Sequence, residues 1–407
     1  MGLLNTFGTE GLIGPIKKSD SFNDASAQKA ITKLRKNPKS AIPKVAELLD
    51  TSSKAEYQRI LEILVELVSP KTLEYFIPLL SSNSEKVRQG ATDALCQVDT
   101  IDPNILISYL GDEKISKSSV LLILTAHKKK IKATNIIRFI FNVEHSERIT
   151  LFKILDSIAT ENDVTEIINR LDNKDTFIRA SFARILKKFD KEHVRYALIK
   201  LLDDEQKTVR LAALESLCAM SGDLDIEKLV GLISDPDFNV QSKAVETILS
   251  IGHPDTVKYL VPHLKDDSEY TRRAAVEVLN EIASPDSVRD LFKVIKDDDW
   301  WVRSRSADAL GKIGGPKVVK AVIALLKDKD EFVRRSAIEI INATQDESTY
   351  NALIGALGDS DWWVRERAVD GLANLGNKQA IPLLIKLLHR NDERKSDKNA
   401  ESMSLIL

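Results

Sequence analysis

The stretch DDDWWVRSRSADALGKIGGPKVVKAVIALLKD, residues 297–328, decides the fold. Its apolar residues recur at helical intervals, first at Val302 and Leu310 and then again at Val319 and Val322. This spacing is typical of two amphipathic helices that each bury one face. The Gly-Gly-Pro sequence between them predicts the end of one helix and the start of the next, because glycine suits a helix C-cap and proline a first turn.

The same pattern returns every 31 residues through the second half of the chain. One column of the repeat holds arginine at six of seven positions. Its members are Arg179, Arg210, Gln241, Arg272, Arg303, Arg334 and Arg365. Asp299, Asp330 and Asp361 stand four residues before their column arginines, where a helix needs an N-cap acceptor, and Ser268 is equivalent to them. No segment alternates with the period of a strand, so we expect none.

The register continues upstream with less regularity, where Arg88, Lys117 and Arg148 occupy the same column. We therefore predict an all-α fold, a right-handed α-solenoid of about twelve helical-hairpin repeats of ~31 residues each. The expected divisions are an N-terminal arm at 1–22, degenerate repeats at 23–174, regular repeats at 175–389 and a polar C-terminal tail at 390–407.

Composition excludes several classes of protein. The chain has 407 residues and a net charge of -2, so no overall basic field indicates nucleic-acid binding. No apolar run approaches the roughly 18 residues of a membrane span. The two cysteines, Cys96 and Cys218, lie far apart, which favours buried thiols in a reducing cytoplasm over a disulfide or zinc framework.

The sequence offers no pattern typical of catalysis. None of the six histidines lies at a metal-ligand spacing, and there is neither a nucleophile elbow nor a phosphate-binding glycine loop. Most acidic residues recur with the repeat, which favours helix capping over acid–base chemistry. We predict that the chain is not an enzyme and holds no cofactor or metal.

The repeat unit D-x-D-x-x-V-R-x-x-A-x-x-A-L-x-x-I-G resembles the short HEAT repeat of the phycobilisome-lyase type, closely over 175–389 and more weakly over 23–174. The resemblance implies that the second helices, which begin at the capping Asp, line a concave face. It also implies a ladder between neighbouring repeats, with acids at Asp299, Asp330 and Asp361 and bases at Arg303, Arg334 and Arg365. Gln241 and Thr271 depart from the pattern, so we expect a weaker ladder there.

The turn that enters the second helix is aromatic in six of seven consecutive repeats, and arginines follow at once. These residue types are enriched at protein-binding hot spots, and they also stack on bases and contact phosphates. Alternatively, the rings cover the seam between repeats. Because adjacent helix residues point about 100° apart, we expect one Trp of each pair to be packed and the other exposed. The candidate binding residues are Tyr270, Trp300, Trp301, Arg303, Arg305, Phe332, Trp362, Trp363, Arg365 and Arg367.

Two further segments leave alternatives open. The basic stretch HKKKIK at 127–132, with Arg138 beyond it, is either a solvated helix end or a contact for an acidic partner or a phosphate. The tail after His389 ends in the apolar MSLIL. It either docks on the last repeat, or the chain is a fragment in which the array serves a missing output domain.

We therefore expect a cytoplasmic, non-catalytic scaffold or regulatory module whose partner is another protein bound along the concave second-helix face. The alternative is a nucleic acid or phosphate ligand bound through the same aromatic and arginine edge. A third possibility, implied by the resemblance, is bilin-lyase activity. The sequence identifies neither the partner nor the oligomeric state.

Overall fold

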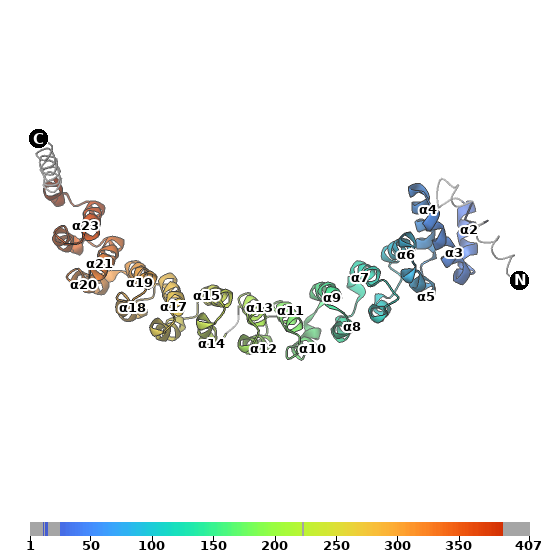
Figure 1. Cartoon of the computed structure of the whole chain (residues 1–407), viewed down its shortest axis with the longest axis horizontal. Coiled ribbons are helices and arrows are strands. Elements are labelled where there is room, and N and C mark those ends of the chain that lie inside the picture. Colours follow the sequence, from blue (N-terminus) through green and yellow to red (C-terminus); the bar gives the residue numbers. More distant parts are fainter. Residues whose placement is uncertain (1–10, 12, 15–24, 222–223, 386–407) are drawn as a thin grey trace, which may run out of the picture. The chain divides into compact units, whose positions relative to one another are not determined.

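The computed structural model describes residues 11, 13–14, 25–221 and 224–385, which form helices and turns without a β-strand. The chain divides into two compact units, residues 1–174 and 175–407, and within each unit helix pairs follow one another along the chain (Figure 1). This confirms the predicted α-solenoid class. The number of repeats and the handedness stay predictions. The predicted tail at 390–407, and nearly all of the predicted arm at 1–22, lie outside the described residues.

The first unit contains the less regular repeats. Its α-helices are α2 (Ala25–Arg35), α3 (Pro38–Thr51), α4 (Lys54–Leu67), α5 (Leu73–Phe76), α6 (Glu85–Gln97), α7 (Lys117–Ala126), α8 (Ala133–Phe139), α9 (His145–Ile158) and α10 (Val164–Ile168). Short 3-10 segments extend or replace several of them, the longest at Pro103–Gly111.

The second unit alternates short first helices with longer second helices. The first helices are α12 (Glu192–Lys200), α14 (Ile226–Gly231), α16 (Thr256–Leu260), α18 (Val288–Val294), α20 (Gly315–Leu325) and α22 (Tyr350–Ala356). The second helices are α11 (Thr176–Leu186), α13 (Lys207–Leu217), α15 (Phe238–Ile251), α17 (Glu269–Ile282), α19 (Trp300–Ile313), α21 (Glu331–Thr344) and α23 (Trp362–Leu375). Each second helix contacts the next one, so they form one layer and the first helices another (Figure 1).

The predicted caps open the second helices. The carboxylate of Asp299 accepts a hydrogen bond from the backbone N–H of Val302 at 3.1 Å. Asp330 and Asp361 cap α21 and α23 in the same way, and Ser268 caps α17. Each cap satisfies a backbone donor that has no partner within its helix, which stabilises the helix by about 1 kcal/mol.

The helix faces predicted from the apolar spacing form the core. Val302 and Leu310 of α19 are fully buried, as are Val319 and Val322 of α20 apart from a few per cent of their surface. Burial of each such side chain is worth roughly 1.5–3 kcal/mol. Three other residues on these faces are only half-buried, namely Ile313, Ile323 and Leu326.

Two glycines of α19 allow the helix to pack and to end. Gly314, with a φ of 58°, ends α19, and α20 begins at once with Gly315. Gly311 faces α21, where an added Cβ would lie 2.6 Å from the Cβ of Ala343. Real Cβ atoms do not approach so closely, so the lack of a side chain at Gly311 sets the distance between these two helices.

Replacing Gly311 with alanine should therefore destabilise the chain by about 1–3 kcal/mol, although alanine favours a helix, because α19 and α21 must move apart. Gly355→Ala is the matched control, since nothing lies within 4 Å of the Cβ that it would add. Urea unfolding followed by circular dichroism measures both. Equal unfolding midpoints for the two variants would contradict the close approach.

Candidate functional site

Five of the six column arginines of the second unit donate to the turn that precedes their own helix. The Nη1 of Arg334 donates to the backbone carbonyl oxygens of Asp328 and Lys329 at 3.0 and 3.3 Å. The corresponding pair of bonds is made by Arg210, Arg272, Arg303 and Arg365. In the first unit Arg88 donates to the carbonyl of Ser82, so this degenerate repeat retains the contact.

The other edge of the guanidinium reaches the next repeat. The Nε and Nη2 of Arg334 donate to the two carboxylate oxygens of Asp359 at 2.9 and 3.0 Å, and both side chains are nearly buried. Three further pairs repeat this geometry with the same separation of 25 residues: Arg179–Asp204, Arg210–Asp235 and Arg272–Asp297. Bidentate pairs of this kind are among the strongest polar contacts in proteins.

The ladder thus exists, but the acids predicted for it are wrong. The column arginines bind the Asp that lies two residues before the capping Asp. The capping carboxylates face the N-termini of their own helices, and two of them receive the arginine that follows the column. Asp299 pairs with Arg273 and Asp361 pairs with Arg335, each at 2.6 Å. Asp330 caps α21.

The ladder shifts the titration of its acids. Burial by itself would raise the pKa of Asp359, but hydrogen bonds from Arg334 and from the backbone N–H of Asp361 hold it below its ordinary value. At Asp361 the hydrogen bond from Arg335 is the largest cause of a lowered pKa. These carboxylates are therefore charged at neutral pH and contribute their full attraction there.

Three column positions of the second unit have no carboxylate on this edge among the described residues. Gln241 keeps the bond to its own turn, from Nε2 to the carbonyl of Asp235 at 2.8 Å, but makes no ion pair, which agrees with the weaker ladder expected there. At Arg303 the equivalent acid is Asp328, which binds Nζ of Lys296 at 2.7 Å instead. The guanidinium of Arg303 lies over the ring of Phe332, 5.2 Å from its centroid. Arg365 also lacks a carboxylate partner among the described residues.

The two tryptophans of each pair meet edge to face and differ in exposure. Trp300 is 62% exposed, and its neighbour Trp301 is half-buried under the guanidinium of Arg305. In the second pair Trp362 is 58% exposed and Trp363 38% exposed. The first pair has the expected asymmetry, but the prediction is wrong for the second pair, in which both rings are exposed because Trp363 opens onto a groove.

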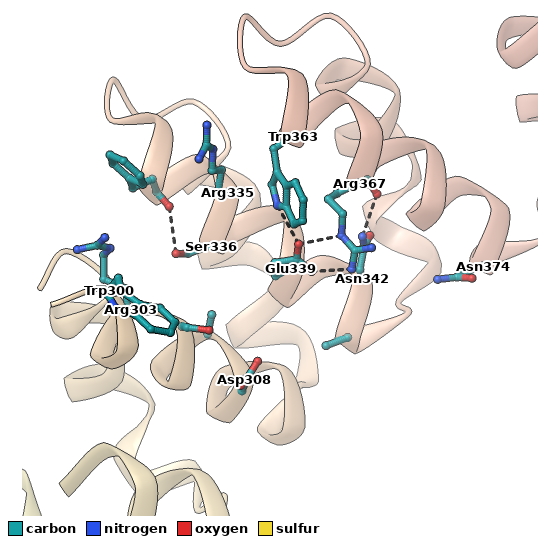
Figure 2. A pocket seen from close by; sticks show the side chains of 14 residues that line it. Trp300, Arg303, Asp308, Arg335, Ser336, Glu339, Asn342, Trp363, Arg367 and Asn374 are labelled. Atoms are coloured by element: carbon teal, nitrogen blue, oxygen red, sulfur yellow. Dashed lines mark hydrogen bonds and ion pairs between the residues drawn. The ribbon is translucent and has the colours of Figure 1, made fainter. Parts of the chain in front are cut away.

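A groove of about 680 Å³ crosses three second helices, α19, α21 and α23. We call it the aromatic groove, and Figure 2 shows its side chains. It is lined by Trp300, Arg303, Ser304, Ala307, Asp308, Phe332, Arg335, Ser336, Glu339, Asn342, Ala343, Trp363, Arg367 and Asn374. Exposed rings thus alternate with charged and amide groups along one surface of the second unit.

A polar cluster holds one end of the aromatic groove in place. Glu339 accepts two hydrogen bonds from Arg367, both at 2.8 Å, and a third from the indole Nε1 of Trp363 at 3.1 Å (Figure 2). Asn342 donates to the backbone carbonyl of Arg367 at 2.8 Å. The ring of Trp363 is thereby fixed in orientation, which reduces the entropy that a ligand must remove on binding.

The structure brings together five of the ten candidate binding residues at the aromatic groove: Trp300, Arg303, Phe332, Trp363 and Arg367. The other five do not line it, namely Tyr270, Trp301, Arg305, Trp362 and Arg365. Sequence reasoning missed Glu339 and Asn342 as groove residues. A signal existed, since Glu339 follows Arg335 by four residues and Asn342 follows Glu339 by three, which places all of them on the same face of α21.

Other candidate features show no second site. Cys96 and Cys218 are free but only half-buried, which corrects the expectation of buried thiols. Burial, assisted by Asp93, raises the pKa of Cys96 to about 11, so its thiol is unreactive at neutral pH. Within the described residues we find no cluster of potential metal ligands and no helix long and apolar enough to cross a membrane.

The basic stretch at 127–132 is partly neutralised. His127 is buried, with Nε2 2.7 Å from the carbonyl oxygen of Leu95. Lys130 pairs with Asp99, while Lys128 is exposed. This supports a helix end with solvated cations.

Comparison with known proteins identifies the repeat. A family model for HEAT repeats matches residues 198–280, 226–294, 258–342 and 319–402, which together span about half of the chain. No curated protein sequence matches the chain. The model describes HEAT repeats in general, so the phycobilisome-lyase-like subtype stays a prediction.

Several solved structures are similar to the chain at low sequence identity. A chain from the structure in which Kap95p binding switches the loops of RanGDP is 14% identical, with 91% of this chain and 61% of that chain covered and a TM-score of 0.45. The Escherichia coli protein YibA is 22% identical over 61% of this chain and 95% of its own, with a TM-score of 0.35. Human deoxyhypusine hydroxylase is 18% identical over 62% and 99%, with a TM-score of 0.28. Since every TM-score lies below 0.5, the family assignment rests on the family model.

The ladder predicts a defined response to acid. The pKa of Asp359 is lower in the folded chain than its ordinary value of 3.8, so its contribution to stability is complete above the ordinary value and is lost as the pH falls from there through the lowered pKa of the folded chain. Asp359→Asn should therefore lower stability by about 2 kcal/mol at pH 7. This deficit should shrink as the pH falls below about 4, where the carboxyl begins to take up a proton in the unfolded chain before it does so in the folded chain.

Thermal unfolding at several pH values measures this difference. Asp286→Asn removes the same charge from an exposed acid and is the control, for which we expect little change at any pH. A deficit for Asp359→Asn that stayed constant or grew in acid would show that the Arg334 pair is not the source of the stability.

Proposed function

The chain belongs to the HEAT-repeat family, and on this basis we propose that it is a non-catalytic scaffold or regulatory module that binds another protein along its second-helix layer, at the aromatic groove. Repeat arrays of this kind bind partners over extended surfaces built by several consecutive repeats. The cytoplasmic location and the exclusion of catalysis are part of this proposal.

The composition of the aromatic groove carries the proposal. Trp300, Phe332 and Trp363 expose ring surface across three consecutive repeats, with arginines beside them. Tryptophan and arginine dominate the binding energy of protein interfaces, because a large ring desolvates much area and a guanidinium adds directed hydrogen bonds. The fixed orientation of Trp363 gives the aromatic groove the pre-organisation that favours binding of a partner.

The ladder weighs against the nucleic-acid alternative. Nucleic acids are bound through many arginines and lysines that neutralise phosphates. Along this surface Arg272, Arg273, Arg334, Arg335 and Arg367 already bind carboxylates of the chain itself. Few cations are left for a phosphate backbone, so a protein partner is the better fit to the charges.

Bilin-lyase activity is the third candidate. It ranks last because its only support is the resemblance of the repeat to the phycobilisome-lyase type. Mixing the chain with a bilin and an acceptor protein tests it directly, and a new visible absorption band that persists after denaturation would establish attachment of the pigment.

To test the protein-binding proposal, a partner is captured from cells that produce the chain, purified and titrated by calorimetry. Replacing both Trp300 and Phe332 with alanine should weaken binding at least about 30-fold, since each ring is a hot-spot candidate worth about 2 kcal/mol. Tyr196→Ala is the matched control, because Tyr196 is also 62% exposed but lies on the first helix α12.

Salt separates the two classes of partner. Protein binding through aromatic rings should weaken by less than about tenfold between 0.15 and 0.5 M NaCl, whereas binding of nucleic acid should fall far more steeply. Equal affinity of the double variant and wild type, or captured material that is lost on nuclease treatment, would reject the proposal.

A further inference from the structure

The strongest unexplained feature of the aromatic groove is the open edge of Arg303. In four other repeats the Nε and Nη2 edge of the column arginine holds a carboxylate from the residue 25 positions later. At Arg303 that residue is Asp328, and Lys296 binds it at 2.7 Å instead. The arginine at which the ladder is interrupted therefore lines the aromatic groove.

The guanidinium of Arg303 is fixed in orientation by hydrogen bonds to the backbone. Its Nη1 donates to the backbone carbonyl oxygens of Asp297 and Asp298 at 2.5 and 3.0 Å, which fixes the plane of the guanidinium. The group lies over Phe332 and lines the aromatic groove beside Trp300 (Figure 2). Donors on a fixed guanidinium over an aromatic ring bind an anion without further ordering of the side chain.

The other charged groups of the aromatic groove are already matched. Arg335 binds Asp361, Arg367 binds Glu339, and Asp308 pairs with Arg305 at 3.2 Å. Arg303 is the lining cation whose Nε and Nη2 donate to no carboxylate of the described chain. A ligand that enters the aromatic groove therefore meets one unmatched positive charge, flanked by exposed aromatic surface.

We propose that the aromatic groove binds an acidic segment of the protein partner, with an Asp or Glu carboxylate on the Nε and Nη2 edge of Arg303 and a neighbouring apolar side chain against Trp300 and Phe332. The partner's carboxylate takes the place that Asp359 takes on Arg334. This inference rests on the proposed function and specifies its partner. A single open guanidinium suits one carboxylate and is too little for a phosphate backbone.

Lys296 leaves the Nε and Nη2 edge of Arg303 without a partner from the chain, because it binds Asp328. It lies outside the lining of the aromatic groove and holds Asp328 through a bond between repeats. When Lys296 is replaced by alanine, Asp328 is free to bind Arg303 and complete the ladder. Lys296→Ala therefore blocks the carboxylate position without removing any residue that touches the ligand.

The experiment selects ligands without assuming their sequence. A library of random twelve-residue peptides displayed on phage is selected against the full chain, and enriched peptides are synthesised and titrated by fluorescence anisotropy. Enriched sequences should share an acidic residue next to an aromatic or aliphatic one. Replacing that acidic residue with its amide should weaken binding at least about tenfold, the size expected for one charge-assisted pair.

Two variants of the chain test the assignment of Arg303. Arg303→Gln should lose at least about tenfold in affinity and should fold, because Gln241 occupies the same column and keeps the bond to its own turn. Lys296→Ala should lose affinity to a similar degree. Arg289→Gln removes an exposed arginine of α18, in the layer of first helices, and should bind like wild type. Unfolding midpoints confirm that each variant is folded.

Three results would overturn the inference. They are selection without enrichment of acidic residues, undiminished binding by Arg303→Gln, and binding of a fluorescein-labelled random single-stranded oligonucleotide in preference to the peptides. Peptides that lack acidic residues but lose affinity with Trp300→Ala would reject the acidic segment and leave the proposed function standing. Loss of enrichment for all peptides, together with no effect of Trp300 on the purified partner, would reject both.

Discussion

The second unit depends on an arginine that recurs at one position of the repeat and contacts both its own repeat and the next one. One nitrogen of its guanidinium closes the turn before its own helix, and the opposite edge binds a carboxylate in the next repeat. Both contacts are made by one rigid plane, so the conformation of a turn and its distance from the following repeat are set together. Each repeat of a solenoid touches only its neighbours. An arginine that links the turn of its own repeat to the next repeat therefore helps to order the array from one repeat to the next.

The candidate site follows from the same constraint. The bond from the column side chain to the preceding turn recurs from α13 to α23, so the residues just before the column position stand at equivalent places in these repeats. Aromatic residues at those places form the rings at Trp300, Phe332 and Trp363, and the helix face below them supplies Glu339. The repeat thus places the three rings at equivalent positions, and residues that do not recur with the repeat, such as Glu339, complete the aromatic groove. A carboxylate from outside can complete the ladder only where the chain leaves it incomplete, and within the aromatic groove that place is Arg303.

Sequence alone predicted the parts of this structure that are local and periodic. Helix positions, the caps at Asp299 and Asp361 and the helix end at Gly314 all depend on residues within one turn of each other, and all were predictable. The ladder partners were not, because two acids separated by one residue occupy the loop and only the fold decides which faces the preceding repeat. Asp328 likewise has two cations within reach, Lys296 in the turn after α18 and Arg303 on α19, and no spacing rule predicts that it binds Lys296. Half of the candidate binding residues reached the aromatic groove, since neighbouring positions on a helix point in different directions.

The missing rung at Gln241 has a mechanical consequence. Every other junction between consecutive second helices from α11 to α23 is crossed by at least one ion pair. Between α15 and α17 no ion pair is found among the described residues, and the polar connection that crosses the junction is the contact between Ser234 and His263 at 3.2 Å. The two helices are therefore held together mainly by apolar packing, which has no preferred direction. When a chain of rigid elements is bent, it deforms most at its least stiff joint. We therefore expect the second unit to bend most easily at the junction between α15 and α17.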